Sequence, residues 1–326
     1  MYMKLFIICS IPFIISYALS RVVIWRSAGW GLIDLPNARS SHSVPTPRGG
    51  GIGIVSGIIA GVAVVYAAGL ERFTSLAWLA ALTAAMAVTG FVSDRCNSPV
   101  RLRLAAQLTM ALAAVFILGR AGISWPGALI AIGIAGAVNF YNFMDGIDGL
   151  AGAQAAIGGA ALAAFGFITG QSWLIFSGLI MAGAAAGFLA LNVTPAKIFM
   201  GDTGSYAIGF FFACVPLLDG RLFVPVMLVM GTFLFDTIVT LALKPGRGIR
   251  WHEAHRSHFY QRAVALGYSH LQVTAAMGAL TILFSAGACI YLVSQATAVK
   301  TVIVAAELSA LVLCAALISK NRRGLA

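Results

Sequence analysis

The sequence predicts an all-α, polytopic integral membrane protein. Hydrophobic residues make up 60% of its 326 residues, charged residues make up only 10%, and the mean hydropathy is +0.94. A soluble domain carries about 25% charged residues. Apolar runs of about 20 residues recur along the chain, and each is long enough to cross a hydrocarbon core of about 30 Å as a helix.

Eleven such helices are expected in one integral domain, residues 1–326. The first run is longer than the apolar core of a signal peptide, and no A-x-A-like cleavage site follows it, so a retained helix is expected. In the second run, Gly57 and Gly61 continue a GxxxG pattern from Gly53 and predict close helix packing. The expected spans are 3–25, 49–69, 74–93, 104–119, 123–142, 149–169, 172–191, 204–218, 222–243, 271–294 and 299–319.

The distribution of Lys and Arg predicts the orientation. With eleven helices, sixteen of the 21 basic residues lie in loops on one side and five on the other. Cytoplasmic loops carry the excess, so the N-terminus is expected outside and the C-terminus in the cytoplasm. The net charge of +11 is then concentrated on the cytoplasmic face, where anionic lipid headgroups or an anionic soluble substrate fit it. No nucleic-acid partner is expected, because no binding module is recognisable.

The acidic residues gather on that same face. Carboxylates beside a membrane are costly unless they are paired or bound to metal, so such a cluster indicates a functional site. Glu307 lies instead inside the last span, where we interpret it as a buried polar group without an assigned function. Seven of the ten acids fall in or beside predicted cytoplasmic loops: Asp34, Asp94, Asp145, Asp148, Asp202, Asp236 and Glu253.

The stretch NFYNFMDGIDGLAG contains four polar residues at every third position: Asn139, Asn142, Asp145 and Asp148. On a helix, such residues share roughly one face. The alternative is a polar helix terminus in which one aspartate caps the next helix. Capping explains one aspartate, but it does not explain four polar groups in register.

Two further aspartates leave similar alternatives open. In IFMGDTGSYAIG, Asp202 is either an N-cap or a metal ligand at a helix start, where backbone N–H groups also favour a phosphate. In GFVSDRCNSP, Asp94 is either a helix-end charge near Arg95 or Arg101, or a site residue. In the loop before the second expected span, Arg48 has either a packing role or a lipid-phosphate contact.

The segment WHEAHRSHFYQR combines histidines and arginines. It fails the HExxH zinc motif, because Arg256 stands four residues after His252. Three histidines can still bind a metal, and a solvated basic helix at the interface is a third interpretation. The neighbouring arginines, Arg250 among them, favour phosphate recognition. The histidines at spacing three are His252, His255 and His258.

Carboxylates and basic groups on one side of a membrane suggest a divalent ion and phosphates. Mg²⁺ prefers hard oxygen ligands and commonly bridges substrate phosphates. Phosphoryl transfer needs mainly positioning and charge neutralisation. We therefore expect Asp145, Asp148 and Asp202 to hold the ion and the 250–258 segment to neutralise phosphate charge. A membrane-embedded site suggests that one substrate is a lipid.

These motifs together resemble the polyprenyl-phosphate N-acetylhexosamine-1-phosphate transferases, glycosyltransferase family 4. The long AHRSHFYQ form is most similar to the enzymes that initiate O-antigen chains. Any one motif alone is weakly specific, and the set covers residues from about 34 to 262. In family order, the matching pieces are DLPNARSSHSVPTPRGGG, NFMDGIDGLAG, PAKIFMGDTGS, FDT at Phe235 to Thr237, and EAHRSHFYQR.

The resemblance implies transfer of a HexNAc-type sugar-1-phosphate from a UDP-linked amino sugar to undecaprenyl phosphate in the bacterial inner membrane. UMP would be released, a lipid-linked surface glycan would be initiated, and Mg²⁺ or Mn²⁺ would be the cofactor. Membrane lipids are further expected partners, and a homodimer is one candidate assembly. The implied site is catalytic at Asp94, Asp145, Asp148, His255 and His258, metal-binding at Asp202, Asp148 and Asp145, and substrate-binding at Asn139, Asn142, Arg250, Arg256 and Arg48.

One position departs from the family. The usual Asp-Asp pair at the end of the third span is Ser93-Asp94 here, so a proposed general base is lacking. A phosphate monoester is mostly dianionic at neutral pH, so we expect catalysis without that base, the alternative being impaired activity. A large gain in Ser93→Asp would contradict this expectation. An ion-coupled transporter is the competing function, but it predicts acids near the membrane midplane.

Overall fold

The computed structural model describes residues 2–36, 44–71, 74–96, 98–119, 124–243 and 258–323. It is almost entirely helical, with one small antiparallel ribbon of β1 (Ile33–Asp34) and β2 (Thr46–Pro47). The helices are α1 (Tyr2–Trp30), α2 (Gly51–Ala67), α3 (Thr74–Cys96), α4 (Val100–Ile117), α5 (Trp125–Phe143), α6 (Leu150–Thr169), α7 (Ser172–Asn192), α8 (Gly201–Leu218), η1 (Gly220–Leu222), α9 (Phe223–Val229), α10 (Gly231–Ala242), α11 (Phe259–Ala265), α12 (His270–Val293) and α13 (Thr297–Arg323).

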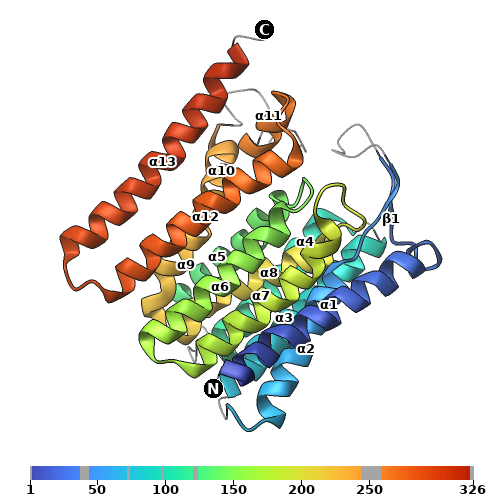
Figure 1. The fold of residues 1–326 in the computed structure, drawn as a ribbon, viewed down its shortest axis with the longest axis horizontal. Helices are drawn as coiled ribbons and strands as arrows, with labels where there is room; N and C mark the ends of the chain where they lie inside the picture. The colour runs from blue at the N-terminus through green and yellow to red at the C-terminus, as the bar shows by residue number, and fades with distance from the viewer. Residues whose placement is uncertain are drawn as a thin grey trace.

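The predicted multi-pass, all-α class is confirmed. Within the described residues, nine helices are long and apolar enough to cross a membrane, and a bent helix pair raises the number to ten. The apolar α2 is shorter, at 17 residues. The start of α1 and the end of α13 lie at opposite ends of the helix bundle (Figure 1). The count of eleven and the side on which each end lies stay predictions.

The expectation of one continuous helix over 222–243 is wrong. The chain breaks at Met230, and the segments on either side are bent by 75°. The Val229 carbonyl at the break accepts a hydrogen bond of 2.8 Å from the Gln154 side chain on α6. Thr281 on α12 donates in turn to the Gln154 side-chain oxygen at 2.6 Å. This buried network satisfies a backbone group that a continuous helix would have bonded internally.

Close backbone contacts hold the bundle together. Added Cβ atoms at Gly57 and Gly61 would lie 2.7 Å from the Pro12 carbonyl and 2.8 Å from the Ile180 side chain, which confirms the close packing expected of these glycines. On α3, an added Cβ at Gly90 would lie 2.2 Å from the Asp202 carbonyl oxygen. The backbones of α3 and α8 therefore meet where the candidate site begins.

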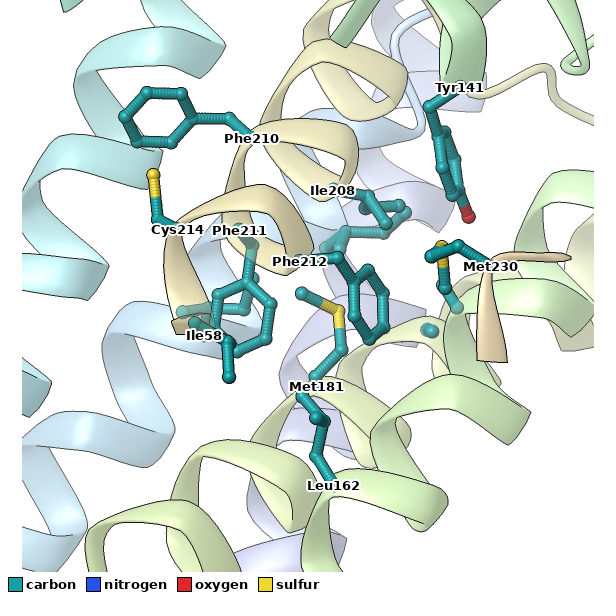
Figure 2. Packing of buried hydrophobic residues seen from close by; sticks show 14 of the residues in the cluster. Ile58, Tyr141, Leu162, Met181, Ile208, Phe210, Phe211, Phe212, Cys214 and Met230 are labelled. Atoms are coloured by element: carbon teal, nitrogen blue, oxygen red, sulfur yellow. The ribbon is translucent and has the colours of Figure 1, made fainter. Parts of the chain in front are cut away.

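Helix α8 runs through the centre of the core. It packs against α2, α3, α5 and α9, and its three consecutive phenylalanines point in different directions into the surrounding helices (Figure 2). Because its body is fixed on several sides, the start of α8 has a defined position relative to its neighbours. The buried residues of Figure 2 include Ile58, Tyr141, Leu162, Met181, Ile208, Phe210, Phe211, Phe212, Cys214 and Met230.

Candidate active site

The site is built around the first turn of α8. Gly201 has φ +74°, a conformation that glycine adopts readily, and it turns the chain into the helix. The first N–H groups are capped from another helix: Asp94 Oδ1 accepts from Asp202 N at 3.0 Å, and Asp94 Oδ2 accepts from Thr203 N at 2.9 Å. The Thr203 hydroxyl also donates to Oδ2 at 2.7 Å. Thus Asp94 is the cap of α8, and the Asp202 side chain remains available for other contacts.

Three helices direct side chains at the Asp202 carboxylate. From α3, the Ser93 hydroxyl donates to Oδ2 at 2.6 Å. From α5, the Asn142 amide donates to Oδ1 at 2.8 Å and to the Ser205 hydroxyl at 2.9 Å. From α4, Arg103 Nη1 lies 3.5 Å from Oδ2. Asp202 is therefore a partly buried carboxylate whose orientation is fixed from outside its own helix.

Asp145 lies in the loop after α5 and contributes a further negative charge. Burial raises its pKa to about 7, and the nearby charges of Asp202 and Asp94 raise it as well. Within the described part of the chain, its carboxylate accepts no hydrogen bond from a side chain or the backbone. The structure thus gathers Asp94, Asp145 and Asp202 at one end of the bundle.

Asp148 belongs to a different network. Its Oδ2 accepts from Ala196 N at 3.2 Å, and its Oδ1 lies 3.5 Å from His270 Nδ1. Burial alone would raise its pKa, but these partners outweigh burial and lower it. The expected grouping of Asp145, Asp148 and Asp202 around one ion is not formed, because residues 145–149 are not helical and α6 begins only after Gly149, whose φ is +80°. Spacing of three therefore does not keep the two loop aspartates on one face.

Asn139 and Arg48 lie at the margins of this cluster. The Asn139 amide donates to the Gln107 side chain on α4 at 2.6 Å, so it joins two helices one turn away from Asn142. The Arg48 guanidinium donates to the Asp94 carbonyl and lies 3.9 Å from Asp34. Arg48 thus places positive charge beside the cap of α8.

His258 is buried against Asp236 of α10. Its Nδ1 lies 2.9 Å from Asp236 Oδ1, which also accepts from Phe259 N at 3.0 Å. Asp236 Oδ2 accepts from Tyr260 N at 3.1 Å. The Tyr260 hydroxyl donates to the Phe143 carbonyl at 3.0 Å, so α11 is tied to the end of α5. The predicted site residues Arg250, His255 and Arg256 lie outside the described residues, and their roles stay predictions.

An apolar cavity of about 410 Å³ adjoins this region, between α10, α11, α12 and α13. Asp236 and Tyr260 line one part of it, and Tyr260 also packs against Gly146 in the Asp145 loop. Most of the lining is apolar and includes Phe235, Leu266, Ala276, Met277, Leu280, Leu311 and Ile318.

The described residues suit a metal ion only with few protein ligands. No group of three or more His, Cys, Asp or Glu side chains in the described ranges is placed to share an ion. A carboxylate oxygen has two lone pairs, and Asp202 Oδ1 accepts one hydrogen bond, which leaves room for an outside ligand. Mg²⁺ commonly uses one or two carboxylates, water and substrate phosphates. Asp202 and Asp145 have that chemistry.

Sequence reasoning did not single out several of these residues. Arg103 was counted only as loop charge, because the fourth span was expected to begin at residue 104, whereas α4 begins at Val100. Asp236 was matched only as part of FDT and received no role. His270 carried no local signal, because its partner Asp148 is 122 residues away. The departure at Ser93 was visible, but its contact with Asp202 was not.

Comparisons with known proteins show which family the chain is similar to. Residues 76–219, which contain the Asp202 cluster, match the family model described as glycosyl transferase family 4. A probable undecaprenyl-phosphate N-acetylglucosaminyl 1-phosphate transferase of Bacillus subtilis is 27% identical over 280 residues, covering 80% of this chain and 77% of that protein. A decaprenyl-phosphate N-acetylglucosaminephosphotransferase of Mycobacterium tuberculosis is 28% identical over 311 residues, covering 80% and 76%.

The chain is also similar to an enzyme whose name describes a different activity. A phospho-N-acetylmuramoyl-pentapeptide-transferase of Trichormus variabilis is 33% identical over 224 residues, covering 60% of this chain and 59% of that protein. Among the described residues, the side chains that bond to the Asp202 carboxylate all lie in the matched segment. Residues 76–219 therefore match the glycosyl transferase family 4 model, which confirms the resemblance that the motifs predict.

Proposed function

We propose that this protein transfers an N-acetylhexosamine-1-phosphate from a UDP-sugar to undecaprenyl phosphate, and that it releases UMP. The observation that carries the proposal is the Asp202 carboxylate, which is held from α3, α4 and α5 beside Asp94 and Asp145 in the family 4 domain. The names of the Bacillus and Mycobacterium relatives make N-acetylglucosamine the first sugar to test. The product would initiate a lipid-linked cell-surface glycan, such as an O-antigen.

We assign the binding of Mg²⁺ or Mn²⁺ to Asp202 and Asp145. When bound, the ion would neutralise charge on the donor pyrophosphate. Arg103, which is one-third exposed beside Asp202, adds a fixed positive charge at the same place, and Arg48 adds another next to Asp94. Asp148 stays outside this ligand set, because its carboxylate connects the loop before α8 to α12.

The reaction needs no general base from the protein. A phosphate oxygen of undecaprenyl phosphate attacks the phosphorus next to the sugar, and the bond from that phosphorus to UMP breaks. The attacking phosphate is mostly dianionic at neutral pH. The protein's contribution is therefore to position two anionic substrates and to neutralise their charge.

We place the isoprenoid chain of the acceptor in the apolar cavity between α10 and α13. Its walls are apolar, and Tyr260 connects it to the loop that carries Asp145. The variant Ala276→Phe should raise the KM for undecaprenyl phosphate and leave the KM for a short, soluble prenyl phosphate unchanged. The matched control is Ala275→Phe, because Ala275 directly precedes Ala276 and does not line the cavity. Equal effects of both variants on undecaprenyl phosphate would contradict the placement.

The decisive experiment is a transfer assay. Purified protein in detergent is incubated with radiolabelled UDP-N-acetylglucosamine, undecaprenyl phosphate and Mg²⁺, and labelled lipid and free UMP are measured in equal amounts if the proposal holds. Asp202→Asn should abolish both products, whereas Asp219→Asn, a carboxylate paired with Arg221, should not. Other UDP-amino sugars test the choice of sugar. Failure to label lipid with every UDP-N-acetylhexosamine would overturn the proposal.

A further inference from the structure

Ser93 and Asp94 hold two different parts of the same residue. Asp94 accepts the main-chain N–H of Asp202, whereas Ser93 donates to its carboxylate. The two side chains are neighbours on α3, and both residues are only 5% exposed. Gly90, one turn earlier, brings α3 into backbone contact with the Asp202 carbonyl. One turn of α3 therefore fixes both the position and the rotamer of Asp202.

The chemistry of the contact depends on a hydroxyl at position 93. A serine hydroxyl is a neutral donor, whereas an ionised aspartate can only accept hydrogen bonds. A carboxylate in its place would face Asp202 Oδ2 directly and would add a fourth negative charge to Asp94, Asp145 and Asp202. Like charges at such short separation repel, more strongly where water is partly excluded. In this chain, the residue that replaces the usual acid removes a repulsion and supplies a bond.

We propose that Ser93 is a positioning residue that fixes the Asp202 carboxylate for a divalent cation, and that this hydroxyl takes the structural place of the acid usual in the family without acting as a base. The inference rests on the function proposed above. Ser93 gives its proton to Asp202 Oδ2, and Asn142 holds Oδ1 on the other side. The lone pair left on Oδ1 then has one defined direction. Losing the Ser93 bond frees the carboxylate to rotate and weakens cation binding.

The first test measures cation binding without substrates. Mn²⁺ binding to the purified protein is followed by electron paramagnetic resonance for the wild type, Ser93→Ala, Ser93→Cys and Ser93→Thr. Ser93→Ala and the near-isosteric Ser93→Cys should weaken binding about tenfold, the size expected from losing one hydrogen bond to a charged group. Ser93→Thr, which keeps the hydroxyl, should restore it. The matched control is Ser177→Ala, a buried serine of α7 whose hydroxyl, within the described ranges, bonds to the Leu174 carbonyl alone.

The second test uses the transfer assay. Ser93→Ala and Ser93→Cys should raise the Mg²⁺ concentration for half-maximal rate by the same factor, with the maximal rate largely recovered at saturating Mg²⁺. Ser93→Asp should not be faster than the wild type, because the site needs no general base at position 93. Wild-type Mn²⁺ affinity in both Ser93→Ala and Ser93→Cys would overturn the inference, as would a tenfold faster Ser93→Asp. A wild type that makes no lipid product would instead overturn the proposed function, while the Mn²⁺ comparison would still decide the role of Ser93.

Discussion

His258 and Asp236 form a buried pair, with Nδ1 and Oδ1 2.9 Å apart, at the point where α11 begins. The same carboxylate accepts the main-chain N–H groups of Phe259 and Tyr260. Asp236 thus caps α11 and orients the one histidine of the predicted motif that lies within the described residues. The match to FDT in the sequence corresponds to this physical role.

Removing the carboxylate should destabilise the protein. In Asp236→Ala, two backbone donors and a buried imidazole lose their acceptor, so the free energy of unfolding should fall by about 2–4 kcal/mol. Thermal unfolding in detergent measures the change. Asp219→Ala removes a carboxylate paired with the exposed Arg221 and should change the midpoint far less. Equal shifts in the two variants would contradict the capping role of Asp236.

The pKa of Asp145 predicts a pH dependence of stability in metal-free buffer. This pKa is about 7 in the folded protein, against an ordinary value of 3.8. Between these values the folded state binds more protons than the unfolded state, so this group makes stability fall as pH rises toward 7, with no further loss above it. Asp145→Asn should therefore match the wild type near pH 4 and be more stable at pH 8.

Thermal midpoints measured at several pH values in the presence of a chelator test this dependence. Adding Mg²⁺ at pH 8 should stabilise the wild type and not Asp145→Asn, because the ion would offset the repulsion that the carboxylate experiences. If the thermal midpoints of the two proteins change in parallel from pH 5 to 8, ionisation of Asp145 does not reduce the stability of the folded protein. The transfer activity of Asp145→Asn should be lost at every pH.

The break between α9 and α10 should depend on Gln154. In Gln154→Leu, the Val229 carbonyl loses its side-chain donor, and the Thr281 hydroxyl loses the Gln154 oxygen but keeps the Met277 carbonyl of its own helix. The expected cost is about 1–3 kcal/mol of the free energy of unfolding, seen as a lower thermal midpoint. Thr169→Val, which removes a bond within one helix turn, is the control and should cost less. A neutral Gln154→Leu would show that water replaces the side chain.

Glu307 should be dispensable for transfer. It is 8% exposed on α13, and its Oε1 has no hydrogen-bond partner among the described residues. An unsatisfied carboxylate inside a membrane span is costly, so Glu307→Gln should keep full activity and raise the thermal midpoint. Loss of activity at unchanged stability would assign this residue a functional role.

The sequence predicted best the features that depend on residues close together in the chain. Hydropathy alone predicted the helical segments, because the membrane imposes length and composition on each span. The continuous apolar run over 222–243 gave no sign of a break. That break is stabilised by Gln154, which lies on another helix 75 residues earlier in the chain.

The candidate site shows the same limit. The sequence pointed to its acidic residues, because carboxylates in an apolar chain are unfavourable, but it did not indicate which groups hydrogen-bond to them. Asp94 and Asp202 are 108 residues apart in sequence, and which atom accepts from which depends on the crossing of α3 and α8. Asp145 and Asp148 were expected on one face, because the spacing was interpreted as helical. The chain leaves the helix between them, and each joins a different network.

Ser93 and Asp94 hold different parts of Asp202, so these two adjacent positions should tolerate different substitutions. Capping the main chain of α8 takes two acceptor oxygens, so position 94 has almost no substitute. Holding the Asp202 side chain takes only a proton to donate, so a hydroxyl of either serine or threonine suffices at position 93. The serine at position 93 therefore changes how the Asp202 side chain is held, while the cap of α8 by Asp94 stays intact.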